Sequence, residues 1–227
     1  MDLYPPYTAR AICVRFHTDR PLHATPYQLK GMIIQEFTDH PIVPFINGGY
    51  RAEMRYPRVQ VKVLRRELCL FGLGEGYQAV QSFSQELELF IIENQTYKVE
   101  SKDAPEWDLQ LDQSPTGYIR YKFITPWVAL NQHAVAVYQG LSLKERILYL
   151  NRVLVQNLLF IARELGYKIR FEVNARVRLQ TLTARVVVVQ GSGSFKGYFT
   201  CNMILPDYLG LGHGITKGLG TIVQIES

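Results

Sequence analysis

Two segments, residues 58–64 and 168–178, alternate between apolar and polar side chains and predict β-strands. A period of two places all apolar residues on one face of a strand and all polar residues on the other. The polar positions of the first segment are Arg58, Gln60 and Lys62. Four bases share the polar face of the second segment: Lys168, Arg170, Arg176 and Arg178. That face is either an ordinary solvated surface or a platform for a polyanion.

Helical periodicity is clearest between residues 142 and 166. Ser142 and Glu145 form a capping-box pattern at one end, and Gly166 is a typical residue just beyond a helix end. The apolar residues between them recur every three or four positions: Leu143, Ile147, Leu150, Leu154, Leu158, Ile161 and Leu165. The pattern predicts one long helix that buries this stripe.

A second helix is predicted from Pro26 to Phe37, with Thr25 as its N-cap. It must end by about Asp39, because Pro41 disfavours helical geometry at the preceding residue, His40. We expect His40 to be exposed in the following loop. A short helix is expected to begin near residues 72–76 and to run to Phe83.

The order of elements predicts an α+β protein with two tandem ferredoxin-like (RRM-like) domains and antiparallel sheets. Further strands are expected at residues 10–17, 87–92, 118–124, 183–189, 195–204 and after Gly220. Residues 93–117 are polar and acidic and contain two prolines, so the boundary is placed there. The predicted domains are residues 1–112 and 113–227. Sheets of this kind leave one face free of helices, and such faces commonly bind RNA.

Five of the eleven residues from 210 to 220 are glycine. The glycines are Gly210, Gly212, Gly214, Gly218 and Gly220, and His213 and Lys217 lie among them. Neither a P-loop nor a dinucleotide fingerprint fits, since Lys217 precedes its glycine and a strand follows the segment instead of a helix. The glycine loop is therefore either a flexible connection or a surface on which the backbone approaches a phosphate chain.

Charge is distributed unevenly along a chain whose net charge is +5. Residues 86–113 contain eight acidic residues and two lysines, whereas residues 51–66 contain six basic residues and one glutamate. A basic body with one acidic segment indicates a polyanionic ligand, with nucleic acid the leading candidate. No membrane-length apolar run, signal-peptide pattern or zinc-type Cys/His spacing is present, so we expect a cytoplasmic protein without metal or cofactor.

The segment from Leu205 to Ile222 resembles the glycine-rich signature of the RAMP superfamily. It is most similar to the Cas-six family, the CRISPR-associated endoribonucleases that process precursor CRISPR RNA. Other stretches that match in the right order are 27–31, 55–63, 123–127, 143–165 and 193–199. The resemblance implies paired ferredoxin-like domains in a prokaryotic protein. It also implies metal-independent cleavage by the RNA 2′-hydroxyl, which leaves a 2′,3′-cyclic phosphate and a 5′-hydroxyl.

The resemblance also implies roles for particular residues. His40 occupies the position of the family's catalytic histidine after the first helix, and Tyr27 and Lys62 match supporting residues of some relatives. Relatives often carry one or two histidines just before the strand that follows a Tyr-Pro pair. Residues 44–49 occupy that place in this chain and contain no histidine. A catalytically silent crRNA-binding subunit of an effector complex is therefore the alternative to a processing endoribonuclease.

The expected partners are CRISPR repeat RNA or crRNA, and other Cas proteins of an effector complex, with the chain as a monomer or homodimer. A protein-interaction module with basic faces is a third interpretation. The residues expected to contact RNA include those of the glycine loop and five arginines. They are Arg55, Arg58, Arg170, Arg176, Arg178, Gly210, Gly212, His213, Gly214, Lys217, Gly218 and Gly220.

Overall fold

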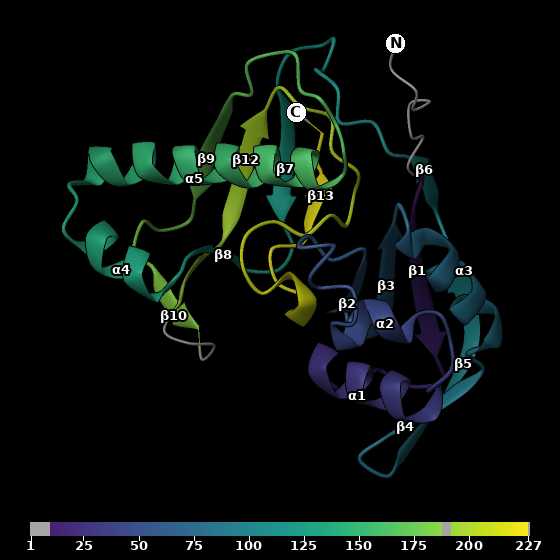
Figure 1. Cartoon of the computed structure of the whole chain (residues 1–227). Helices are drawn as coiled ribbons and strands as arrows, with labels where there is room; N and C mark the ends of the chain where they lie inside the picture. Colours follow the sequence, from purple (N-terminus) through teal and green to yellow (C-terminus); the bar gives the residue numbers. More distant parts are fainter. Residues whose placement is uncertain (1–9, 188–191, 227) are drawn as a thin grey trace, which may run out of the picture. The chain divides into compact units, whose positions relative to one another are not determined.

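The computed structural model describes residues 10–187 and 192–226. The chain forms two compact units, Met1–Gln110 and Leu111–Ser227. The boundary between them lies two residues before the division expected from the sequence. Figure 1 shows the elements of both units.

The first unit is built on an antiparallel sheet of order β2-β3-β1-β5-β4. Its strands are β1 (Arg10–Thr18), β2 (Val59–Leu64), β3 (Glu67–Leu73), β4 (Leu89–Ile92) and β5 (Gln95–Asp103), and β6 (Glu106–Asp108) pairs with β1. Its helices are α1 (Pro26–Glu36), α2 (Val43–Asn47) and α3 (Gly76–Glu86). Without the edge strand β4, this is the β-α-β-β-α-β order of a ferredoxin-like domain.

The helices of the first unit and one face of its sheet form a single apolar core. Ile12 and Val14 of β1 and Val59 and Val61 of β2 lie in it, together with buried residues of α1 and α3 such as Leu29 and Phe83. The start of α1 is fixed locally, because Thr25 Oγ1 accepts a hydrogen bond from the Gln28 N–H and Gln28 Oε1 accepts one from the Thr25 N–H. The predicted N-cap is confirmed.

The second unit contains an antiparallel sheet of order β13-β7-β12-β9. Its strands are β7 (Ile119–Phe123), β9 (Ala175–Leu179), β12 (Gly197–Cys201) and β13 (Ile222–Gln224), and α5 (Leu143–Glu164) packs on it. In chain order the strands read 4-1-3-2, as in a ferredoxin-like domain. The second helix of that fold is replaced by the glycine loop, which contains the 3-10 turn η1 (Ile215–Lys217). The predicted pair of ferredoxin-like domains is confirmed.

A smaller sheet completes the second unit. It has the order β10-β11-β8, with β8 (Trp127–Leu130), β10 (Arg185–Val187) and β11 (Ser192–Phe195), and α4 (Gln132–Gln139) packs against it. The strand predicted at residues 183–189 extends into residues outside the described part of the chain. In the described residues no helix is both long and apolar enough to cross a membrane.

Several expectations about secondary structure and burial are not met. No strand was predicted between residues 93 and 117, but this acidic segment contains β5 and β6, whose residues are mostly exposed. In segment 168–178 only Ala175–Leu179 pairs as a strand, so Arg170 lies outside the sheet. Leu143 and Ile147 are 66% and 41% exposed and do not belong to the buried stripe of α5.

The length of α5 explains the exposure of its first turns. A helix of 22 residues is about 33 Å long, whereas four strands span only roughly 15–19 Å. The buried residues of α5 begin at Leu150, where the helix reaches the sheet. Figure 1 shows the N-terminal end of α5 extending past β9 toward α4.

The glycine loop closes as a tight hairpin against β8. The N–H of Leu211 donates to the carbonyl of Gly220, that of Gly220 to Pro126, and that of His213 to Val128. A Cβ atom on Gly220 would lie 1.8 Å from the carbonyl oxygen of Leu211, and one on Gly212 would lie 2.6 Å from that of Val128. These two glycines are needed because backbones approach each other too closely for any side chain.

Replacing Gly220 by alanine should strongly destabilise the second unit. The residue has a φ of +68° and no room for a methyl group, so the backbone pairing of the loop must open. Gly117→Ala is the matched control, since Gly117 has a φ of +90° with nothing within 4 Å of its Cβ position. We expect a loss of roughly 1–2 kcal/mol for the control, the cost of left-handed geometry alone, and a clearly larger loss for Gly220→Ala. Equal urea-unfolding midpoints for the two variants would show that the contact with Leu211 is unimportant.

Candidate functional site

His40 is buried, contrary to the exposed position expected from the sequence. It is 8% exposed and lies between the end of α1 and helix α3. Its ring packs edge-on against Phe83, with a centroid distance of 5.3 Å. The chain turns back into the core after α1, since Ile42 and Val43 are themselves core residues, and this turn carries His40 inward.

Both ring nitrogens of His40 have partners. Nδ1 accepts a hydrogen bond from the backbone N–H of Ile42 at 3.0 Å. Nε2 lies 3.1 Å from Ser82 Oγ and 3.5 Å from Glu86 Oε1. Because Nδ1 accepts, the neutral ring carries its proton on Nε2. In this arrangement the free lone pair that a general base requires is already engaged.

Lys62 is also buried, although it lies at a polar position of the alternating strand β2. Its side chain is fully enclosed on the sheet face opposite the helix-covered core. Nζ donates to Gln60 Oε1 at 2.8 Å and lies 6.0 Å from the centre of the Phe71 ring. Desolvation by burial lowers the pKa of Lys62 to about 7.

Tyr27 is 79% exposed in the first turn of α1. The rest of the helix, with a rise of about 1.5 Å per residue, separates it from His40. Lys62 lies on the other face of the sheet from both. In this conformation the three residues expected to act together in catalysis are therefore not brought to one place.

The two arginines expected on the basic strand differ in exposure. Arg55 is exposed in the segment before β2. Arg58 is only 5% exposed, because its Nε donates to Glu75 Oε2 at 2.7 Å and its NH1 donates to the carbonyl of Tyr56 at 3.1 Å. The expectation that Arg58 faces RNA is not met in this structure, because a carboxylate already holds the guanidinium.

The tip of the glycine loop presents two side chains to solvent. Both are exposed: His213 lies two residues before the 3-10 turn η1, and Lys217 is the last residue of that turn. Gly214 and Gly218 adopt left-handed conformations on either side of that turn, with φ of +74° each. The glycines therefore shape the loop, and the loop offers the histidine and the lysine to a ligand.

Basic residues gather on one face of the four-stranded sheet in the second unit. Arg176 and Arg178 of β9 are exposed there, as predicted. Sequence analysis missed Arg120 and Lys122 of β7, which share this face because β12 pairs with both β7 and β9. The alternation of residues 118–123 was the signal that would have identified them. Arg170 is exposed but lies before the strand.

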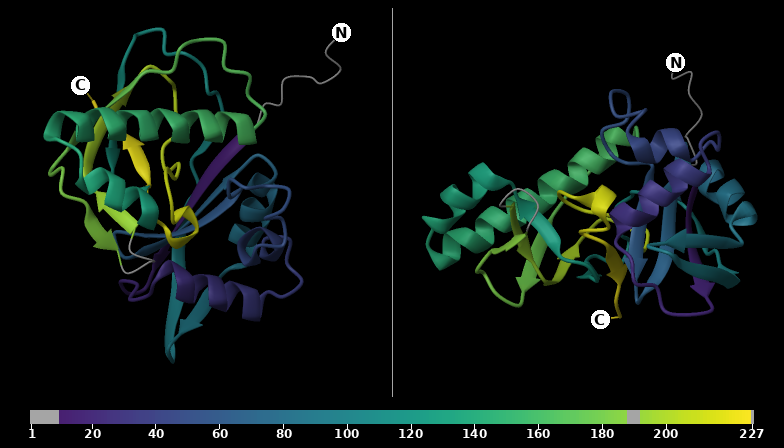
Figure 2. Two further views of the ribbon diagram at one scale, coloured as in Figure 1. Left: turned by 60° about the vertical axis from the view of Figure 1, so that its left-hand side comes forward. Right: turned by 90° about the horizontal axis from the view of Figure 1, so that it is seen from below.

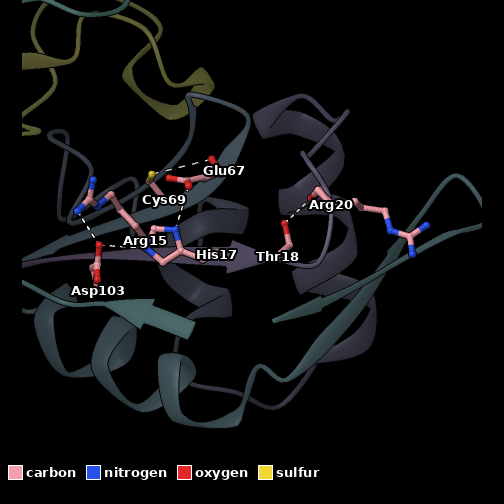
Figure 3. Close-up of polar contacts among 7 residues, drawn as sticks. All are labelled: Arg15, His17, Thr18, Arg20, Glu67, Cys69 and Asp103. Carbon is pink, nitrogen blue, oxygen red and sulfur yellow. Dashed lines mark hydrogen bonds and ion pairs between the residues drawn. The ribbon is translucent and has the colours of Figure 1, made fainter. Parts of the chain in front are cut away.

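A second charged cluster joins three neighbouring strands of the first unit (Figure 3). His17 of β1 lies between two carboxylates: Nδ1 is 2.9 Å from Glu67 Oε1 and Nε2 is 3.0 Å from Asp103 Oδ2. Arg15 also donates to Asp103 at 2.7 Å. Ionised carboxylates only accept hydrogen bonds, so the arrangement favours the doubly protonated ring. Hydrogen bonds to Asp103 and then Glu67 raise the pKa of His17, and the bond from His17, with Arg15 nearby, lowers the pKa of Asp103.

This cluster should make stability depend on pH. A histidine whose pKa is raised by folding stabilises the folded state below its unfolded pKa of about 6.5, and that stabilisation is lost as the pH rises through the raised value. Asp103, with a lowered pKa, loses its contribution only in acid. We therefore expect the thermal midpoints of wild type and His17→Gln to differ most near about pH 5–6 and to converge above about pH 8. A gap that does not change with pH would contradict this, and His133→Gln, at an exposed histidine of α4, should show no such gap.

Comparison with known proteins places both units in one family. A family model described as the Cas6b N-terminal domain matches residues 8–108, and one described as the Cas6b C-terminal domain matches residues 114–225. An uncharacterised protein of Methanocaldococcus jannaschii is 33% identical over 112 residues, which are 48% of this chain and 74% of that protein.

Solved structures agree in fold. A crystal structure of Cas6b has a TM-score of 0.81 at 24% identity and covers 96% of this chain and 99% of its own. A crystal structure of the CRISPR RNA processing endoribonuclease Cas6b has a TM-score of 0.69 at 22% identity and covers 96% of this chain and all of its own. Because the two domain models match in order across both units, the chain belongs to the Cas6 family of CRISPR processing proteins, in its Cas6b branch.

Proposed function

We propose that this protein binds CRISPR repeat RNA and cleaves precursor crRNA. The observation that carries the proposal is the match of both Cas6b domain models, in order, over nearly the whole chain. A structural neighbour is itself described as a CRISPR RNA processing endoribonuclease. The exposed basic residues of the second unit and of the glycine loop supply the positive surface that a polyanion needs.

The proposed reaction is attack by the 2′-hydroxyl of the nucleotide upstream of the scissile phosphate. The O–P bond to the 5′-oxygen breaks, and the products are a 2′,3′-cyclic phosphate and a 5′-hydroxyl. The 2′-hydroxyl loses its proton to a base, the leaving oxygen gains one from an acid, and cations stabilise the charge on phosphorus in between. No metal ion takes part in this route.

We propose His40 for the acid or base step, with Tyr27 and Lys62 in support, and Arg55, Arg176, Arg178, His213 and Lys217 as RNA contacts. For His40 to act, its ring must leave the contacts with Ile42 and Ser82, so RNA binding has to reorganise the turn after α1. Lys62 with a pKa near 7 is able to exchange a proton, yet it is enclosed in the same way.

The buried positions of His40 and Lys62 favour a second candidate function. A catalytically silent crRNA-binding subunit, which assembles with other Cas proteins, needs the basic surfaces and no acid or base at all. In that case His40 is a core residue that anchors the turn between α1 and α2.

A cleavage assay with the cognate repeat RNA in EDTA distinguishes the two. The endoribonuclease should cut once and leave a cyclic phosphate, and a 2′-deoxy nucleotide upstream of the cut should abolish cleavage without weakening binding. His40→Asn keeps an acceptor for the Ile42 N–H, and it should slow cleavage by about 10²–10⁴-fold if His40 is the acid or base. The exposed His133 supplies the control, since His133→Ala should cut like wild type.

Three outcomes decide the matter. Tight binding without cleavage by wild type would support the silent subunit. If His40→Asn cleaves at the wild-type rate and has unchanged thermal stability, His40 is neither the acid nor the base of the reaction. The exposed histidines His23 and His213 are then the next candidates. Absence of binding to any repeat RNA would overturn the proposed function.

A further inference from the structure

The four-stranded sheet of the second unit has one covered and one open face. Helix α5 lies across one side, where Tyr121, Phe123 and Phe199 stack in the core. Figure 2 shows α5 along that side and no helix of this unit along the other. The open face is formed by the alternate residues of the same strands, and it contains the bases Arg120, Lys122, Arg176 and Arg178.

The strand register sets a tyrosine in the middle of these bases. Tyr198 of β12 pairs with Lys122 of β7 on one side and with Arg178 of β9 on the other. Two residues further along β12, Thr200 lies between Arg120 of β7 and Arg176 of β9 in the same way. None of the residues in β7, β9, β12 and β13 is acidic, so no carboxylate on these strands competes for the bases.

Two exposed tyrosines accompany the arginines. Tyr198 is 38% exposed, and the Arg120 guanidinium lies 5.4 Å from its ring centre. Tyr118, just before β7, is 50% exposed, and the Arg176 guanidinium lies 6.0 Å from its ring centre. Such cation–π contacts leave the remaining ring surface available to a flat partner. Cations and aromatic rings therefore alternate over the open face.

We propose that this face binds an unpaired segment of RNA, with bases stacked on Tyr198 and Tyr118 and phosphates held by the surrounding arginines and Lys122. The inference rests on the proposed function, in which the ligand is RNA, and adds that the protein selects single-stranded RNA here. In an A-form duplex the base faces are stacked on each other and unavailable to a tyrosine, whereas unpaired bases offer them. Stacking and phosphate contacts are the two elements of single-strand binding.

The probes are a labelled unpaired oligoribonucleotide of about eight nucleotides and a duplex of the same sequence, both measured with the full chain at several salt concentrations. Tyr198→Ala should weaken binding of the unpaired probe about tenfold or more, since stacking contributes roughly 1–3 kcal/mol per base. Tyr198→Phe should bind like wild type, because the ring is retained. Tyr198→Leu keeps apolar bulk without a π-face and should behave like Tyr198→Ala, which separates stacking from a folding defect.

The basic residues should affect binding differently. Arg178→Ala and Lys122→Ala should each reduce the slope of log affinity against log salt by about 0.7, whereas the tyrosine variants leave the slope unchanged. Phe160→Ala is the matched control for the ring, since Phe160 has Arg163 at 5.8 Å but lies on α5, away from the open face. It should bind the unpaired probe like wild type.

The inference is overturned if the variants Tyr198→Leu and Tyr118→Ala bind the unpaired probe as tightly as wild type. It is also overturned if these variants lose affinity for the unpaired probe and for the duplex to the same extent. Both results leave the proposed function intact, because the repeat RNA is still bound and cut. Failure of the proposed function looks different: wild type then binds neither probe nor repeat RNA.

Discussion

The second unit depends on two close approaches of backbone: the glycine loop approaches β8, and the two ends of the loop approach each other. In a ferredoxin-like domain a second helix packs beside the first and covers the sheet. Here backbone hydrogen bonds from His213 to Val128 and from Gly220 to Pro126 fasten a hairpin in its place. Side chains at Gly212 or Gly220 would push the backbones apart, so the glycines act first as a structural device. At the tip of the loop, the side chains of His213 and Lys217 are exposed to solvent.

In both units the two faces of the sheet carry different kinds of side chain. In each unit one face is apolar and covered by helices, as the core around α1 and α3 and the aromatic stack under α5 show. The other face carries the charged residues. In the first unit Lys62 is enclosed, and the partly exposed residues of the His17 cluster are paired with one another. In the second unit Lys122, Arg176 and Arg178 are exposed, Arg120 is half-buried, and the strands carry no acidic residue, which makes this face the better candidate for RNA.

Several features could be predicted from the sequence because they depend on short-range interactions. The caps at Thr25 and Ser142 involve residues three positions apart, and Gly166 ends α5 with a φ of +75°. The predicted order of strands and helices indicated the fold class, although β3 and β5 were not predicted. Strand β5 was missed because its residues are mostly exposed and polar, so its sequence has no alternation of apolar and polar residues that would predict a strand.

The sequence by itself determined the periodic elements, the caps, the basic character of β9 and the crowding of glycine near the C-terminus. Tertiary structure decided which polar side chains are accessible. Lys62 of β2 and Arg176 of β9 both lie at polar positions of strands in which polar and apolar side chains alternate. Lys62 is enclosed, whereas Arg176 is exposed. His40 was expected outside the core and lies inside it. The reason is that alternation tells which residues share a face, whereas burial depends on what packs on that face, and the packing partners come from distant parts of the chain.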